Sequence, residues 1–281
     1  MKNNPLLYLL FLLIFASCES MITDVEVPEQ DSKLVIGCYL QPGDTMIEVN
    51  VNRSFPLYES SQFMQPEVNN ATVVISSSQG SITVPWDPAY YDYRISTSSF
   101  PILAGTTYSI EVSAPGFETV TGSTNVPGAA NTQVIFQGWD STWSPTYAEY
   151  VNRYRFEVTD AVGTPSYYRA ILSSVTGDSL MVYGFNADQT KGKEYFTDED
   201  GDLSKFNLEY QLPTQFTHMG NFSAKFILLT VDEAYYNYNK SLVTAVNNSG
   251  NPFSEPALVY GNINKGLGIF GSYQKFTIVV Q

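Results

Sequence analysis

The chain has few of the residues that metal sites and nucleophilic catalysis depend on. Its 281 residues include two cysteines and one histidine. Zinc and iron sites draw mainly on these side chains for their ligands, so we expect no such metal and no cofactor. A catalytic serine needs a base within hydrogen-bond distance and a group that orients the base. His218 is the only histidine that could serve, so the sequence predicts a protein that is not an enzyme.

Positive charge is also scarce. Fourteen Lys and Arg stand against 28 Asp and Glu, which gives a formal net charge of -14. A surface this acidic repels the phosphate backbone of nucleic acids, so no nucleic-acid partner is expected.

Long apolar runs are absent except at the N-terminus, where residues 6–16 form one after the positive Lys2. This run is too short for a transmembrane helix and is typical of a secretory signal. The following Phe15-Ala16-Ser17-Cys18 resembles the lipobox of bacterial lipoproteins, although Phe15 stands where leucine is usual. We predict a signal peptide over 1–17, acylation of Cys18 and an acidic tether over 18–32. The alternative is an ordinary signal peptide that ends near a cysteine.

The second cysteine, Cys38, has no partner in the chain if Cys18 is acylated. Its apolar surroundings predict a buried, inert thiol.

Short alternating segments fill residues 33–127. In 45–52 the side chains of Ile47, Val49 and Val51 share one face, and Pro-Gly pairs mark turns between such segments. This pattern predicts a mainly β protein that begins with an immunoglobulin- or transthyretin-like β-sandwich.

A boundary is predicted at residues 127–131, followed by a β-rich C-terminal domain over 131–281. Asp232 is expected to cap a helix near 233–247, and 276–280 alternate like a final strand. Whether this domain is a barrel or a second sandwich stays open.

The tetrapeptide Gly177-Asp178-Ser179-Leu180 matches the one that gives a serine esterase family its name. Such esterases place the serine near the mature N-terminus of an α/β fold, and an aspartate precedes the histidine by three residues. Here the tetrapeptide lies mid-chain and Gln215 stands three residues before His218. A β-hairpin around 177–178 is the better interpretation.

Carboxylates cluster around Gly201, with Asp198, Asp200 and Asp202 as candidate calcium ligands. Counting Gly201 as the sixth residue of a calcium loop puts Asn207, not an acid, at the twelfth. An Asp-Gly turn is therefore the favoured alternative.

Three Asp-Ser or Asp-Thr pairs resemble the sequon for O-glycosylation of exported proteins in one Gram-negative phylum. The candidate acceptors are Thr45, Ser141 and Ser179.

Aromatic residues are abundant, with 20 tyrosines and 3 tryptophans. Exposed aromatics suit contacts with sugars or proteins, whereas most are expected in the core. The candidate ligand-binding residues are Trp86, Tyr90, Tyr91, Trp139 and Trp143.

The segment 251–273, NPFSEPALVYGNINKGLGIFGSY, resembles the ending of the lipoproteins classed as domain of unknown function 4249. The N-terminal lipobox and the segment around Lys33 agree with that family as well. The resemblance implies a lipid-anchored outer-membrane protein, encoded beside TonB-dependent transporters and without a known activity. It does not indicate whether the protein faces the periplasm or the cell exterior.

The favoured hypothesis is a non-enzymatic accessory of such a transporter. The alternative is a module that captures a small ligand (glycan, peptide or metal chelate), and a hydrolase comes third.

Overall fold

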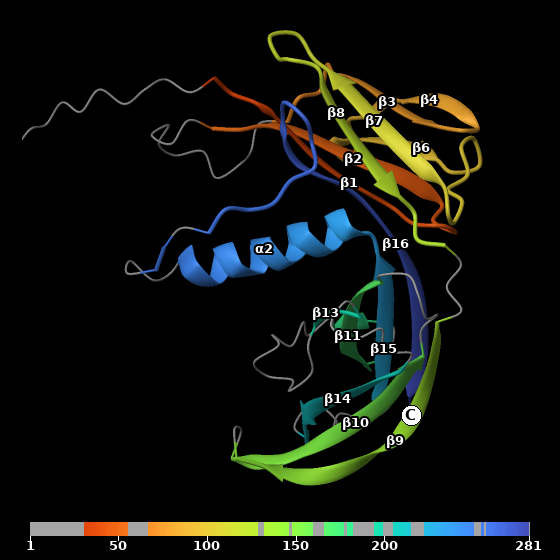
Figure 1. The fold of residues 1–281 in the computed structure, drawn as a ribbon, viewed down its shortest axis with the longest axis vertical. Coiled ribbons are helices and arrows are strands. Elements are labelled where there is room, and N and C mark those ends of the chain that lie inside the picture. Colours follow the sequence, from red (N-terminus) through yellow and green to blue (C-terminus); the bar gives the residue numbers. More distant parts are fainter. Residues whose placement is uncertain are drawn as a thin grey trace, which may run out of the picture. The chain divides into compact units, whose positions relative to one another are not determined.

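The computed structural model describes residues 31–55, 67–128, 132–145, 148–159, 166–176, 179–181, 194–198, 205–214, 222–249, 254–255 and 257–280. Cys18, His218, Asp200 and Asp202 lie outside these residues, so the predictions made for them stay predictions. Residues Ser32–Gln281 form one compact unit, separate from Met1–Asp31. The described part is mainly β, as predicted, and contains one helix (Figure 1). That helix is not long and apolar enough to cross a membrane.

The N-terminal half is the predicted β-sandwich. One layer contains β1 (Leu34–Leu40), β2 (Met46–Arg53), β5 (Trp86–Asp87) and β6 (Asp92–Ser96). The other is a four-stranded sheet in the order β4-β3-β7-β8, with β3 (Thr72–Ser77), β4 (Gly80–Val84), β7 (Thr107–Ser113) and β8 (Val120–Asn125). Alternate residues of each layer are buried in one shared hydrophobic cluster, for example Ile36, Val49 and Ile110. The free Cys38 is buried in this cluster, and burial raises the pKa of its thiol well above the usual range.

The second half is also a pair of packed sheets and not a closed barrel. A three-stranded sheet has the order β14-β10-β9, with β9 (Gln133–Ser144), β10 (Glu149–Thr159) and β14 (Lys205–Pro213). It faces β11 (Tyr167–Thr176), β15 (Phe222–Val231) and β16 (Leu267–Val280) across a second hydrophobic cluster. Phe156 of β10 and Phe226 of β15 stack at the centre, with ring centroids 4.0 Å apart. The short strands β12 (Ser179–Met181) and β13 (Tyr195–Thr197) both pair with β11.

The last strand joins the two halves. β16 pairs in parallel with β1 over 267–272 and then antiparallel with β15 over 273–280, so one sheet runs through both sandwiches. Ile263 and Phe270 complete the first hydrophobic cluster. The predicted domain over 131–281 thus includes residues that belong to the core of the first sandwich, and the predicted domain boundaries stay a prediction. The strand begins nine residues before the predicted 276, because its glycines interrupt the apolar alternation that would have indicated it.

The predicted helix is confirmed as α2 (Glu233–Ser249). The backbone N–H of Tyr235 donates a 2.7 Å hydrogen bond to the Asp232 carboxylate, which caps the helix. The same carboxylate accepts hydrogen bonds from Thr124 of β8 and Ser272 of β16, and burial raises its pKa. Asp232 therefore ties the helix to strands from both halves of the chain.

Only the first turns of α2 lie against the sheet. Tyr235 and Tyr236 are buried there in a cluster with other tyrosines. The predicted apolar side of the helix is not buried along its length, because its second half extends beyond the sheet (Figure 1). Leu242 and Val246 are exposed as a result.

Candidate functional site

The esterase-like tetrapeptide lies in a hairpin, as predicted. The backbone of Ser179 pairs with Thr176 at the start of β12, and residues 177 and 178 lie outside the described part. Within the described residues, β11 and β12 of this hairpin lie at one end of the sheet that also contains β15 and β16.

Asp198, a candidate calcium ligand, is buried between β11 and β13. Its side chain is buried, and Oδ1 accepts a 2.6 Å hydrogen bond from the backbone N–H of Ser166. The carboxylate therefore fixes the start of β11 against the end of β13. No group of three His, Cys, Asp or Glu within the described ranges could hold a metal ion.

The glycosylation candidates differ in their surroundings. Thr45 is exposed in the turn before β2. It lines a pocket of about 470 Å³ together with Tyr39, Asp44, Glu48 and Tyr273. Ser141 lies within β9 and not in a turn, and its hydroxyl donates a 2.7 Å hydrogen bond to Oδ1 of Asn152. Glycosylation at either residue, and at Ser179, stays a prediction.

Two of the three candidate aromatics of the first sandwich, Trp86 and Tyr90, contact side chains of β6. Trp86 is half-buried against the hydrophobic cluster, with its ring 5.2 Å from that of Tyr93. Tyr90 and Tyr91 are exposed at the turn before β6. The guanidinium of Arg94 lies 3.6 Å from the centre of the Tyr90 ring, so this ring already has a cationic partner.

The two remaining candidates, Trp139 and Trp143, come together on one face of the β9–β10 hairpin. In the antiparallel register Trp139 lies opposite Tyr154 and Trp143 lies opposite Tyr150. The ring centroids of these pairs are 6.2 Å and 5.6 Å apart. Trp139, Trp143 and Tyr150 remain 49%, 53% and 59% exposed, whereas Tyr154 is buried. These four residues are called the aromatic surface below.

A β-bulge puts the tryptophans on this face. The β9–β10 register shifts between Arg155 and Phe156, where Gly138 has a φ of +109° that favours glycine. On one side of the bulge Phe136 lies opposite Phe156 and faces the second hydrophobic cluster. The extra residue reverses the alternation, so that Trp139 and not Gly138 continues the same face. Simple alternation along the sequence cannot reveal this reversal.

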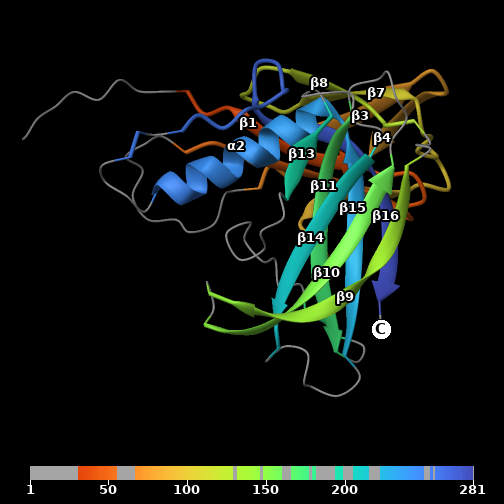
Figure 2. The same cartoon turned by 60° about the horizontal axis from the view of Figure 1, so that its bottom comes forward.

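The aromatic surface is therefore the continuation of a core face. Toward its turn the hairpin curves away from β15 and β16 (Figures 1 and 2), so the opposing sheet no longer covers the inner side chains. Ser141 and Asn152 form a hydrogen-bonded polar pair between the two aromatic pairs. The surface thus offers a tilted ring pair and an edge-to-face ring pair on either side of a small polar centre.

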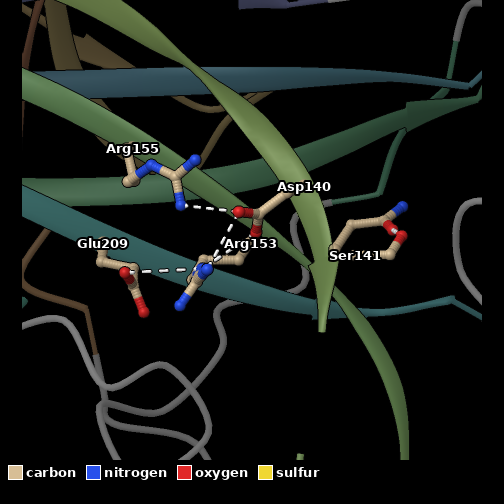
Figure 3. A network of polar contacts seen from close by, with 6 residues as sticks. Asp140, Ser141, Arg153, Arg155 and Glu209 are labelled. Atoms are coloured by element: carbon tan, nitrogen blue, oxygen red, sulfur yellow. Dashed lines mark hydrogen bonds and ion pairs between the residues drawn. The ribbon is translucent and has the colours of Figure 1, made fainter. Parts of the chain in front are cut away.

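The opposite face of the hairpin carries an ion-pair network (Figure 3). The Asp140 carboxylate accepts hydrogen bonds of 2.9 Å from both Nε and Nη2 of Arg153 and one of 3.0 Å from Arg155. These arginines lower the pKa of Asp140 to about 2. Glu209 of β14 approaches Arg153 at 3.7 Å, so the network spans all three strands. Cross-strand pairing of this kind helps to hold the hairpin in one conformation.

Sequence reasoning found two of the four aromatic residues and missed Tyr150 and Tyr154. Alternation of Tyr154 with Arg153 and Arg155 indicated a strand with one apolar face. The pairing with β9, which brings all four residues together, needed the register of the hairpin.

The family model described as "Domain of unknown function (DUF4249)" matches residues 22–278. The chain belongs to this family. Its match covers both sandwiches of the DUF4249 protein, including the shared strand β16. A search of curated proteins found no match.

Among solved structures, a two fibronectin type-III domain segment from chicken tenascin is similar. It shares 16% identity at a TM-score of 0.19, over 71% of this chain and 91% of the tenascin segment. A superposition this loose carries no argument, and the sandwich fold rests on the strands and clusters described above.

Proposed function

We propose that this DUF4249 protein is a non-enzymatic, lipid-anchored accessory of the outer membrane that docks on a TonB-dependent transporter. The observation that carries the proposal is the aromatic surface, where three large rings stay about half exposed on a braced strand pair. Apolar patches rimmed by polar residues mark interaction sites on soluble domains.

The composition of the aromatic surface suits a protein partner. Trp and Tyr are enriched among the residues that contribute most to binding at protein interfaces. Each ring system offers roughly 150–250 Å² for burial, so covering the exposed half of three of them is worth on the order of 7 kcal/mol before the costs of association. The ion-pair network limits the ordering cost, because the strands that carry the rings are already held in place.

The anchoring part of the proposal rests on the N-terminal sequence and on what the family resemblance implies. With Cys18 acylated, the tether over 18–32 spans at most about 50 Å when fully extended. The sandwiches would thus stay within reach of proteins embedded in the same membrane. High local concentration would then strengthen a contact that is weak in free solution.

Affinity purification from outer membranes in mild detergent tests the proposal. The wild-type protein is expected to retain a large barrel transporter, and a Trp139→Ser/Trp143→Ser double variant is expected to lose it. A matched control is Leu242→Ser/Val246→Ser on α2, which removes exposed apolar side chains elsewhere and is expected to retain the transporter. Equal recovery with all three proteins would contradict docking through the aromatic surface.

The Ser141–Asn152 pair favours a second candidate, capture of a small ligand such as a glycan. A polar pair between two pairs of aromatic rings combines apolar contact with hydrogen-bonding groups, as small-ligand sites do. Glycan arrays with the purified soluble domain separate the two candidates. Glycan binding that the Trp139→Ser/Trp143→Ser variant loses would favour ligand capture.

A further inference from the structure

Strand β9 forms an open edge of its sheet. In the order β14-β10-β9 it has a neighbour on one side only, and its ladder runs to β10. Among the described residues, none of the backbone hydrogen bonds outside the regular strands and helix involves residues 133–144. The N–H and C=O groups on the outer side of this 12-residue strand therefore have no backbone partner in the part of the chain that the structure describes.

The features that usually protect an edge strand are almost absent from β9. Its sequence, QVIFQGWDSTWS, has no proline and no lysine. Its single charge, Asp140, is already neutralised by Arg153 and Arg155. The bulge at Gly138 interrupts the edge but leaves 139–144 as a regular segment beside the aromatic surface.

In contrast to β9, the edge strand β8 is partly covered by another segment of the chain. β8 ends the four-stranded sheet, and its Thr121 exchanges backbone hydrogen bonds with Asn264 from the segment before β16. No described segment plays this part for β9.

We propose that residues 139–144 of β9 receive an extended segment of a partner polypeptide as a fourth strand of the sheet. The inference rests on the proposed function and adds the form of the partner, because only an extended backbone satisfies a row of strand donors and acceptors. Alternate side chains of this segment would lie beside Trp139 and Trp143 and be apolar or aromatic. The others would lie on the face of Asp140 and be polar.

Charge favours a foreign segment over a second copy of this chain. Pairing β9 with β9 would bring together two molecules that each carry a formal net charge of -14. Such molecules repel one another, whereas a segment with basic residues is attracted. The partner is therefore assigned as a different polypeptide.

Hydrogen exchange with a synthetic peptide tests the proposal. The probe is Lys-Val-Tyr-Val-Thr-Val-Lys, and its control has the same sequence with every internal amide N-methylated, which removes the strand donors but keeps the charge. With the probe at saturation, alternate amides within 139–144 are expected to exchange at least about tenfold more slowly. The N-methylated control is expected to leave them unchanged. No slowing with the probe, or equal slowing with both peptides, would overturn the proposal.

A pair of proline variants provides a built-in control. Neighbouring residues of a strand direct their N–H groups to opposite sides, so one of Ser141→Pro and Thr142→Pro removes an N–H from the ladder with β10 and the other removes an N–H from the outer edge. Ser141→Ala and Thr142→Ala control for the loss of each side-chain hydroxyl. The variant whose Tm stays near that of wild type is expected to bind the probe at least tenfold more weakly. Wild-type binding by that variant would overturn the proposal.

Two further outcomes separate this inference from its alternatives. If the transporter co-purifies but the β9 amides in the complex exchange as in the free protein, the proposed function stands and strand addition fails. If sedimentation shows dimers that the edge-altering proline variant abolishes, the occupant is a second copy and the assignment to a foreign segment fails.

Discussion

Replacing Gly268 by alanine is expected to separate β16 from β1. A Cβ at this position would lie 2.0 Å from the carbonyl oxygen of Ile36 and 2.9 Å from its carbonyl carbon. Both are backbone atoms of β1, so no side-chain rotation can relieve the contact. The φ of +102° adds a conformational cost, because side chains other than glycine rarely adopt it.

The magnitude follows from these two effects. A non-glycine residue in such a conformation costs about 1–3 kcal/mol. Moving the strands apart also weakens the parallel pairing between 35–40 and 267–272, where each lost hydrogen bond contributes about 0.5–1.5 kcal/mol. The free energy of unfolding should therefore fall by more than about 4 kcal/mol, a large part of the 5–15 kcal/mol typical of a folded domain.

Urea unfolding followed by far-UV circular dichroism and tryptophan fluorescence measures this loss. The matched control is Gly43→Ala, where φ is +87° but no atom lies within 4 Å of the added Cβ. That variant carries the conformational cost alone and is expected to lose about 1–2 kcal/mol. If the two variants lose the same free energy within about 1 kcal/mol, the close approach of β16 to β1 does not destabilise the Gly268→Ala variant.

Three more predictions concern single polar or thiol groups. Burial raises the pKa of Asp232 in the folded protein above its ordinary value of 3.8. The folded state therefore holds the proton more tightly than the unfolded state does, which stabilises the protein at low pH. This stabilisation is lost as the pH rises through the raised pKa. The stability of wild type relative to Asp232→Asn, measured by urea unfolding, should therefore decrease from about pH 4 upward, and a flat difference would contradict this. Cys38 is buried and its thiol pKa is raised, so iodoacetamide should modify it only in denaturant, as mass spectrometry would show. Radiolabelled palmitate should enter the wild-type protein and not Cys18→Ser, and equal labelling of both would remove the anchor from the proposed function.

The sequence by itself determined the elements whose causes are local. Alternation of apolar residues indicated the strands of the first sandwich, because each strand has one buried and one solvated face. Asp232 followed by an apolar periodicity located α2, since a capping carboxylate and its helix are neighbours in the chain. The apolar surroundings of Cys38 correctly predicted a buried thiol.

Tertiary structure decided what depends on residues far apart in the chain. The parallel pairing of β16 with β1 joins the two ends of the described chain and relies on Gly268, which contributes no apolar signal. The bulge at Gly138 reverses the faces of β9 and thereby groups Trp139 and Trp143 with two tyrosines of β10. Alternation reports only which side of its own strand a residue occupies. The register between strands, and the point where an opposing sheet ends, arise from packing over long sequence distances and decide which of those sides becomes a surface for binding.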